Sequence, residues 1–183
     1  MSRDPAPHDA RDEHRRWVRS ALADHERALV NYAARITGDL ERARDVVQET
    51  FLRLCRQEGA ELEGRVREWL FTVCRNLALD VRAKESRMSA IGEMGADRVA
   101  AREAEPGFAL EQGDAVSAVM RAIGVLPASQ QEVLVLKFRH GLAYKEIAQA
   151  TGHSVGNVGY LIHHGVRALR AKLAGDLREG LTS

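Results

Sequence analysis

The stretch from Tyr144 to Arg170, YKEIAQATGHSVGNVGYLIHHGVRALR, constrains the fold of this chain more than any other. Its small and apolar residues predict two helices that cross at a tight turn. Ala148 lies where the first helix must let the second come close, Gly152 suits a turn position with positive φ, and Val158 points back into the crossing. This is the spacing of a helix-turn-helix, whose second helix enters the DNA major groove. The plainer alternative is an ordinary helical hairpin.

Composition and charge narrow the class of protein further. Leu, Ala, Arg and Glu dominate the 183 residues, only 5% are aromatic, and no Val/Ile/Tyr-rich run alternates as a strand would, so we expect an all-α fold. The net charge is only +1, so any charge that binds nucleic acid must be local.

No apolar run could cross a membrane, no signal-peptide core is present, and two cysteines within helical patterns suit a reducing compartment. We therefore expect a cytoplasmic protein that is not inserted in a membrane.

The apolar periodicity predicts two small helical domains joined by a linker. Three amphipathic helices separated by short loops fill residues 13–87, after a proline-containing start that we expect to lack regular structure. Residues 88–113 are rich in glycine and acidic side chains and form the predicted linker. Residues 114–176 resume the helical pattern and end with the helix-turn-helix.

Four residues of these helices are expected in the cores. Phe71 and Cys74 belong to the apolar pattern of the third helix, and Cys55 follows that of the second. Phe138 belongs to the helix that precedes the helix-turn-helix. Both cysteines are interpreted as small core residues rather than as partners in a disulfide.

Two further segments carry more polar residues than a core helix needs. DVVQETFLRL, residues 45–54, turns a polar and partly acidic face outward. The stretch from Arg65 to Arg87 holds six Arg or Lys against three acidic residues, interleaved with Trp69 and Phe71. Such a mixture suits single-stranded nucleic acid, because bases stack on the rings while guanidiniums hold the backbone. The plainer interpretations are a solvated helix face for the first segment, and a Trp69 packed on the first helix for the second.

In this order and at this separation, the three segments resemble an RNA polymerase sigma factor of the sigma-70 family, of the extracytoplasmic-function (ECF) type. DVVQETFLRL is similar to the region 2 helix that docks on the polymerase, and REWLFTVCRNLALDVRA to the part that reads and opens the minus-10 element. The helix-turn-helix and the helix before it are similar to region 4, which reads the minus-35 element. Residues 13–87 would then be region 2, residues 88–113 the linker, and residues 114–176 region 4.

The resemblance implies a protein that binds core RNA polymerase and directs promoter recognition and transcription initiation. It implies no enzyme, because the polymerase does the chemistry, and hence no catalytic residue, cofactor, metal or small-molecule substrate. The implied partners are the clamp helices of the polymerase β′ subunit, the β flap, promoter DNA and an anti-sigma factor, which in many members of the family is membrane-anchored.

The resemblance also assigns contacts to positions of this sequence. Core polymerase would meet Asp45, Gln48, Glu49, Phe51 and Leu52. Minus-10 DNA would meet Arg67, Trp69, Arg75, Asn76, Asp80, Arg82 and Lys84. Minus-35 DNA would meet Lys145, Ser154, Asn157, Gly159, Tyr160, His163, His164 and Arg167. The loop 57–64 corresponds to the segment that forms a pocket for a flipped promoter base, but it is polar and glycine-rich here, and no residue of it is assigned to the base.

The second helix of the helix-turn-helix departs from the family pattern. Members often carry SxGTVKSRLxRAR there, whereas this chain has SVGNVGYLIHHGVR. Gly159 and Leu161 stand where Lys and Arg are frequent, and His164 and Val166 replace two more arginines. Each lost phosphate contact lowers the salt-dependent slope of binding by about one unit. We therefore expect weak isolated minus-35 binding, with the polymerase supplying most of the hold on a promoter.

Other functions compatible with this fold are a stand-alone helix-turn-helix regulator, which binds duplex DNA as a dimer, and a helical adaptor that uses the fold only for protein contacts.

A metal site at His163 and His164 is disfavoured. Adjacent helical residues point about 100° apart, and no Cys or His stands four residues away on that helix.

Overall fold

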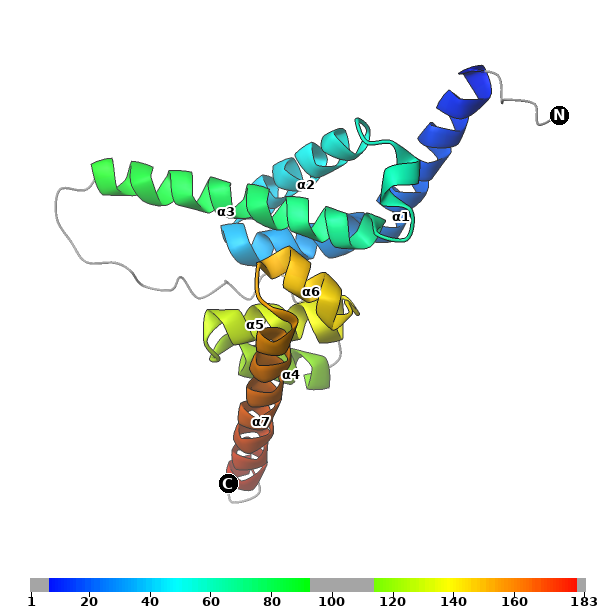
Figure 1. Ribbon diagram of the computed structural model, residues 1–183. Coiled ribbons are helices and arrows are strands. Elements are labelled where there is room, and N and C mark those ends of the chain that lie inside the picture. The colour runs from blue at the N-terminus through cyan, green and yellow to red at the C-terminus, as the bar shows by residue number, and fades with distance from the viewer. Residues whose placement is uncertain (1–6, 93–113, 181–183) are drawn as a thin grey trace. The chain divides into compact units, whose positions relative to one another are not determined.

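The computed structural model describes residues 7–92 and 114–180, and every regular element within them is helical (Figure 1). The absence of strands from these two ranges confirms the predicted all-α class. The chain divides into two compact units, an N-terminal one with three α-helices and a C-terminal one with four. The domain bounds at 13–87 and 114–176 and the linker at 88–113 stay a prediction, since residues 93–113 lie outside the described ranges.

The N-terminal unit packs three helices around one apolar core. They are α1 (Pro7–Thr37), α2 (Leu40–Leu54) and α3 (Val66–Gly92), with the short 3₁₀ helix η1 (Gly59–Leu62) before α3 (Figure 1). The largest side chains that are almost fully buried here are Leu29, Tyr32, Leu54, Leu70 and Phe71. The rings of Tyr32 and Phe71 are tilted by 56° with centroids 5.4 Å apart, a geometry that aromatic pairs prefer. The predicted core position of Phe71 is confirmed.

The corner between α1 and α2 is specified by two adjacent residues. Gly38 has a φ of 73°, and its N–H donates to the carbonyl of Ala34 at 2.9 Å. Asp39 caps α2, because its carboxylate accepts the N–H of Arg42 at 2.9 Å. Glycine takes positive φ without a Cβ clash, and an aspartate cap satisfies an N–H that the helix leaves unpaired. One helix therefore ends and the next begins within these two residues.

The start of α1 differs from the prediction. The helix begins at Pro7 rather than near residue 13, so residues 7–12 are helical and not irregular. Proline suits the first turn of a helix, because its missing N–H would have no partner there and its φ is already helical. Residues 1–6, also expected to lack regular structure, lie outside the described residues.

The two cysteines occupy different environments. Cys74 on α3 is buried, with its Sγ 3.9 Å from the carbonyl oxygen of Leu29 on α1, which confirms its predicted core position. Cys55 is exposed, which corrects its predicted place in the core. It is the C-cap of α2, one residue beyond the buried Leu54, so the chain is already turning away from the core at that point.

Labelling with a maleimide should therefore separate the two thiols. Cys55 should react promptly in the folded protein, whereas Cys74 should react only after unfolding. Burial raises the pKa of the Cys74 thiol to about 12, and a hydrogen bond with Thr50 opposes that shift only in part, so the reactive thiolate is scarce. Mass spectrometry of the labelled peptides, with and without denaturant, measures the difference. Equal labelling of both cysteines in the native protein would contradict the packing of α3 on α1.

The C-terminal unit is built around its last helix. It contains α4 (Asp114–Gly124), α5 (Ala128–Leu134), α6 (Tyr144–Thr151) and α7 (Val155–Gly180), and a five-residue π-helical segment, η3 (Val135–Arg139), continues α5. α7 contacts each of the other three α-helices. The fully buried side chains of the unit include Val133, Leu134, Leu136, Leu142, Ile147 and Val158.

α6 and α7 form the predicted helix-turn-helix. Gly152 has a φ of 76° and donates its N–H to the carbonyl of Ala148 at 2.9 Å, so the turn uses the left-handed conformation that favours glycine. The hydroxyl of Ser154 caps α7 by accepting the N–H of Asn157 at 3.1 Å. Val158 is fully buried where the helices cross. The turn and the buried valine confirm the sequence prediction.

Phe138 does not join the core and is 64% exposed, which corrects its predicted position. It lies in η3, and a π-helical turn holds more residues than an α-helical turn. Phe138 lies beyond the run of buried residues at 133–136, towards the end of η3.

Gly165 lets α7 lie close against α5. A Cβ at this position would come 2.8 Å from Cδ1 of Leu134, closer than carbon atoms normally pack, and Leu134 is itself fully buried. Gly156, in the first turn of α7, would place a Cβ in open space. Packing therefore requires glycine at position 165 and not at position 156.

The two glycines form a matched pair for a stability measurement. Gly156→Ala should raise the free energy of unfolding by up to about 1 kcal/mol, because alanine is the better helix former. Gly165→Ala gains the same helix propensity, but overpacking against Leu134 lowers its free energy of unfolding by about 1–3 kcal/mol. The melting temperature of this variant should therefore be unchanged or lower. Thermal unfolding followed by circular dichroism measures both. If Gly165→Ala were stabilised as much as Gly156→Ala, the close approach of α7 to α5 would be wrong.

Candidate nucleic-acid interface

The outward face of α7 carries most of the residues predicted to read duplex DNA. Val158, Ile162 and Gly165 turn into the core at helical spacing, which leaves the opposite face to solvent. That face carries Asn157, Tyr160, His163, His164 and Arg167, which we call the α7 stripe. All of its members are exposed except His164, which is half-buried. Arg167 is the permanent cation of the stripe.

The rings of the α7 stripe contact one another. Tyr160 and His164 are one helical turn apart, and their ring centroids lie 4.1 Å apart with 40° between the planes. His163 meets His164 edge to face at 5.5 Å. Nowhere in the described parts of the chain do three His, Cys, Asp or Glu side chains gather in a group that could hold a metal ion. The stripe is therefore an aromatic and imidazole surface with one guanidinium.

The other predicted minus-35 residues lie near this stripe in sequence but differ in exposure. Lys145 on α6 and Ser154 at the cap of α7 are exposed. Gly159 is half-buried, and a Cβ there would make an ordinary 3.6 Å contact with the ring of Tyr144. A side chain at position 159 would therefore fit without displacing its neighbours.

α3 presents the predicted minus-10 residues on two sides. Leu70, Cys74 and Ala78 are fully buried and define the core side of the helix. The opposite side carries Trp69, Asn76, Asp80 and Lys84, which we call the α3 stripe; Trp69 is half-buried and the other three are exposed. Arg67 and Arg75, both half-buried, and the exposed Arg82 lie nearer the core side. The fold thus aligns four of the seven predicted residues and sets the three arginines apart.

α2 brings four of the five predicted polymerase contacts to one face. Asp45, Gln48, Glu49 and Leu52, which we call the α2 face, share the outward side of the helix. Glu49 also pairs with Arg53, whose Nε lies 2.9 Å from a carboxylate oxygen. Phe51 points the other way and is only 7% exposed, whereas Leu52 is 48% exposed. Leu52 is therefore the apolar side chain that this face offers to a partner.

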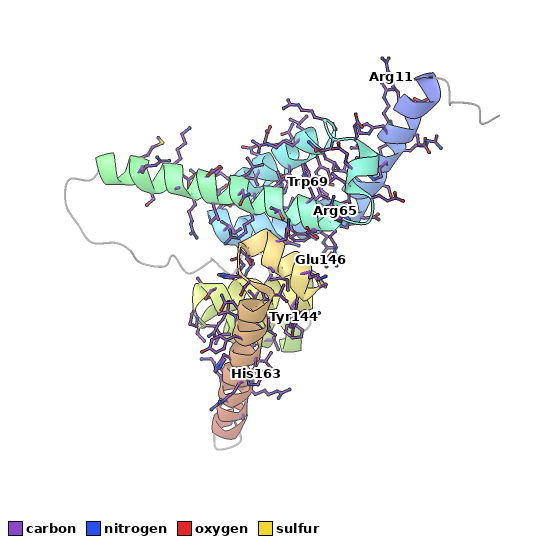
Figure 2. All side chains as sticks on the ribbon, viewed as in Figure 1. Arg11, Arg65, Trp69, Tyr144, Glu146 and His163 are labelled. Atoms are coloured by element: carbon purple, nitrogen blue, oxygen red, sulfur yellow. The ribbon has the colours of Figure 1, made fainter. Side chains whose placement is uncertain are left out.

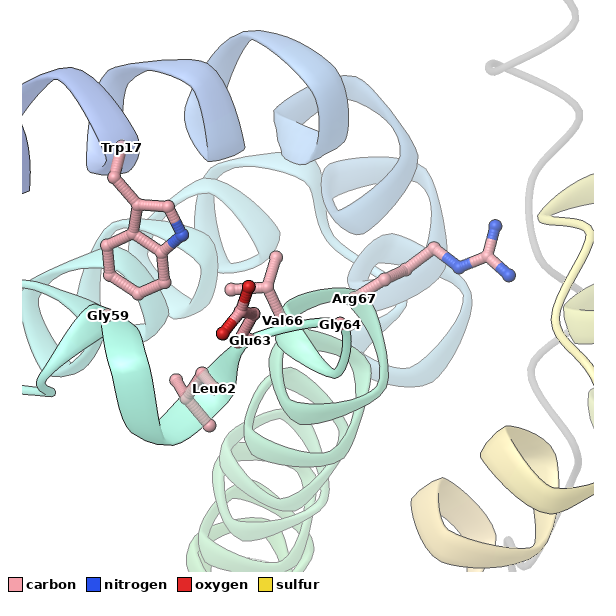
Figure 3. A pocket seen from close by; sticks show the side chains of 7 residues that line it. All are labelled: Trp17, Gly59, Leu62, Glu63, Gly64, Val66 and Arg67. Carbon is pink, nitrogen blue, oxygen red and sulfur yellow. The ribbon is translucent and has the colours of Figure 1, made fainter.

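A cavity of about 520 Å³ opens between α1, η1 and the start of α3 (Figure 3). It is lined by Trp17, Gly59, Leu62, Glu63, Gly64, Val66 and Arg67. A Cβ on Gly59 would lie 3.4 Å from the indole of Trp17, so the ring lies directly against the loop backbone. Figure 3 shows the Arg67 side chain pointing away from the other lining residues. The cavity combines an aromatic ring, two aliphatic side chains and two charged groups of opposite sign.

Residues of α1 support the wall of this cavity. His14 contacts the indole of Trp17 with centroids 5.5 Å apart, and its Nε2 lies 3.1 Å from the carbonyl oxygen of Cys55. Further along α1, burial lowers the pKa of His25, the charge of Arg67 lowers it further, and Asp24 opposes both effects. His25 is therefore neutral at neutral pH, and Arg67 supplies the positive charge at this end of α3.

Sequence reasoning missed the part of α1 that lines the cavity. By the family resemblance, the loop 57–64 corresponds to a base-pocket segment. Trp17 is far from this loop in sequence and reaches the loop only through the packing of α1. A signal was nevertheless present. Trp17 stands among Arg15, Arg16 and Arg19, the same mixture of aromatic and basic residues that drew attention to α3.

Two segments of the chain match models of one protein family. Residues 21–88 match sigma-70 region 2 and residues 117–169 match sigma-70, region 4. Together with the two helical units in the same order, these matches define the sigma-70 class. Similar proteins identify the subfamily within that class. The chain is 31% identical over 160 residues to the ECF RNA polymerase sigma factor SigL of Mycobacterium tuberculosis. This match covers 85% of this chain and 88% of SigL. The chain belongs to the extracytoplasmic-function sigma factors.

Further comparisons agree with this assignment. The ECF sigma factor SigE of Mycolicibacterium smegmatis is 32% identical over 155 residues, covering 84% of this chain and 60% of SigE. The sigma factor RpoE from Bartonella quintana, solved in complex with the anti-sigma factor NepR, has a TM-score of 0.63 at 23% identity, covering 85% of this chain and 96% of that one. CnrH, solved with the cytosolic domain of CnrY, has a TM-score of 0.59 at 23% identity, covering 92% and 94%. At such identities the two structures show the fold alone.

No helix in residues 7–92 and 114–180 combines the length and the apolar character that crossing a bilayer requires.

Proposed function

We propose that this chain binds core RNA polymerase, directs it to promoters and helps to open the minus-10 element, as a cytoplasmic initiation factor without catalytic activity of its own. The observation that carries the proposal is that one chain joins a region 2 segment and a region 4 segment, each with an outward face of the required chemistry. A stand-alone helix-turn-helix regulator would not need the region 2 unit, and neither would an adaptor.

The α2 face is the proposed contact with the clamp helices of the β′ subunit. It offers two carboxylates, one amide and the exposed part of Leu52. A polar and acidic surface with one apolar anchor suits a basic partner helix, since the charges orient the encounter and the buried apolar contact supplies affinity. Phe51 would support this face from the core rather than touch the partner.

The α3 stripe and the cavity are the proposed contacts with the opened minus-10 strand. Lys84 and the arginines of α3 can hold phosphates, and Asn76 and Asp80 can hydrogen-bond base edges. The cavity, with the indole of Trp17 as one wall, has room for one unstacked base. Region 2 would then bind single-stranded DNA through stacking and permanent positive charge.

The α7 stripe is the proposed contact with the minus-35 duplex. Asn157 and the imidazoles carry donors and acceptors that can reach base edges in the major groove, while Lys145 and Ser154 can meet phosphates. With one permanent cation on the stripe, this contact adds selectivity rather than most of the affinity.

The β flap and an anti-sigma factor are further proposed partners, the latter because the similar folds RpoE and CnrH were each solved with a second protein.

Loss of the apolar anchor should weaken polymerase binding. Leu52→Ala is expected to raise the dissociation constant for core polymerase about tenfold, because truncation of a buried anchor costs about 1–2 kcal/mol. Leu22→Ala is a matched control, since Leu22 on α1 is similarly exposed, at 38% against 48%, but lies outside the α2 face. Competition binding with labelled protein measures both affinities, and run-off transcription with the reconstituted holoenzyme reads the consequence. Equal affinities for the two variants would remove the α2 face from the polymerase interface.

Loss of the indole should impair promoter opening without affecting polymerase binding. Stacking of one base on an aromatic side chain is worth about 1–3 kcal/mol, so Trp17→Ala should reduce open-complex formation roughly 5- to 150-fold. Trp17→Phe keeps a ring at this position and should recover much of the activity. Permanganate reactivity of thymines in the minus-10 element, on a promoter identified by genomic run-off transcription, gives the measurement. Wild-type opening by Trp17→Ala would exclude a stacked base at this wall.

A further inference from the structure

The α7 stripe combines imidazole side chains with a single guanidinium. The stripe contains two imidazoles and one guanidinium, and no acidic residue occurs between Gly152 and Gly175. Positive charge strengthens contacts with DNA phosphates, and histidine is the side chain that ordinarily gains it between about pH 8 and about pH 5. The basic residues of α3, by contrast, are arginines and a lysine whose charge is constant over this range.

The positions of the two imidazoles on α7 are compatible with positive charge on both rings. His163 is exposed, and Figure 2 labels it on α7. His164 lies 4.1 Å from the Tyr160 ring centroid, within the distance of about 6 Å over which an aromatic ring attracts a cation. The two imidazoles meet at 5.5 Å, so two positive charges there repel each other unless phosphates lie nearby. Bound DNA should therefore favour the doubly protonated stripe.

The elements around α7 supply few carboxylates that could neutralise these imidazoles. Besides the stripe, the described charged or titratable side chains on α4, α5, η3, α6 and the turn before α7 are Arg121, Glu132, Lys137, Arg139, Tyr144, Lys145, Glu146 and His153. Two of these are acidic and four are permanently basic. Glu146 is already engaged at the start of α6, where it accepts the N–H of Ala143.

We propose that minus-35 binding by this sigma factor is coupled to proton uptake at His163 and His164, so that region 4 holds duplex DNA more tightly as the pH falls. The inference rests on the proposed function of α7 as the DNA-reading helix. Each protonated imidazole carries two N–H donors instead of one and a full positive charge. It can then donate to a phosphate or to a guanine edge as the arginines of related helices do.

The test measures binding of the full-length protein to a fluorescent random-sequence duplex at low salt, near pH 8 and near pH 6. Wild-type protein should bind roughly tenfold more tightly near pH 6, with a log–log salt slope steeper by about one to two units. His163→Gln combined with His164→Gln should abolish most of both changes, and His163→Gln alone about half. His25→Gln is the control histidine, because His25 lies on α1 in the N-terminal unit and outside the α7 stripe, and this variant should behave as the wild type. Circular dichroism checks that each variant is folded.

A fifth protein separates the two ways in which the inference can fail. Gly159→Lys adds a permanent cation beside the stripe, and the 3.6 Å spacing to Tyr144 leaves room for its Cβ. It should raise affinity by a similar factor at both pH values. No gain from Gly159→Lys would overturn the assignment of α7 to DNA. A gain from Gly159→Lys together with full pH dependence in the double histidine variant would overturn proton coupling and leave the DNA-binding assignment intact.

Discussion

The close packing of α7 on α5 and α6 determines which side of the DNA-reading helix is left for its ligand. Val158 and Ile162 are buried in the crossing, and the missing side chain of Gly165 lets Leu134 fill the space beside the helix. Because the core holds these three positions, α7 cannot rotate about its axis without exposing Val158 or burying Tyr160. The α7 stripe is thus selected by the core rather than by any contact among its own members.

The same reasoning applies to the N-terminal unit. Phe71 and Cys74 hold one side of α3 against α1, so the opposite side, with Asn76 and Asp80, must face solvent. α1 has a second role in this unit, because its first half continues beyond the family match, which starts at residue 21, and places Trp17 over the loop before α3. One long helix therefore contributes both to the core and to the wall of the cavity.

The sequence predicted those features that are specified by neighbouring residues. The turn at Gly152 forms as expected, and the cap at Ser154 and the corner at Gly38 likewise depend on one residue type at one position. The positions of Cys55 and Phe138 could not be obtained in this way. Hydrophobicity marks both as core residues, but Cys55 lies at the end of α2 and Phe138 lies beyond the buried run at 133–136.

For the candidate site too, the sequence predicted only what depends on residues close together along the chain. The outward polar face expected of residues 45–54 carries Asp45 and Gln48 in the structure. The resemblance grouped Phe51 and Leu52 with that face, and only Leu52 lies on it. What periodicity cannot give is a contact between elements remote in sequence. Trp17 reaches Gly59 only because α1 and α2 pack antiparallel across the corner at Gly38, and no local pattern carries that information.

A weak contact through α7 is compatible with the proposed role because the two units are parts of one chain. When region 2 is held on polymerase, region 4 meets the promoter at an effective concentration that can reach about a millimolar, so a contact of similar dissociation constant is half occupied. Around that point, a tenfold change in affinity moves occupancy from about a quarter to about three quarters. An arginine-rich helix would already be saturated, and its occupancy would respond little to pH. In this proposal, the imidazoles of the α7 stripe regulate minus-35 binding because the rest of the stripe contributes little affinity for DNA.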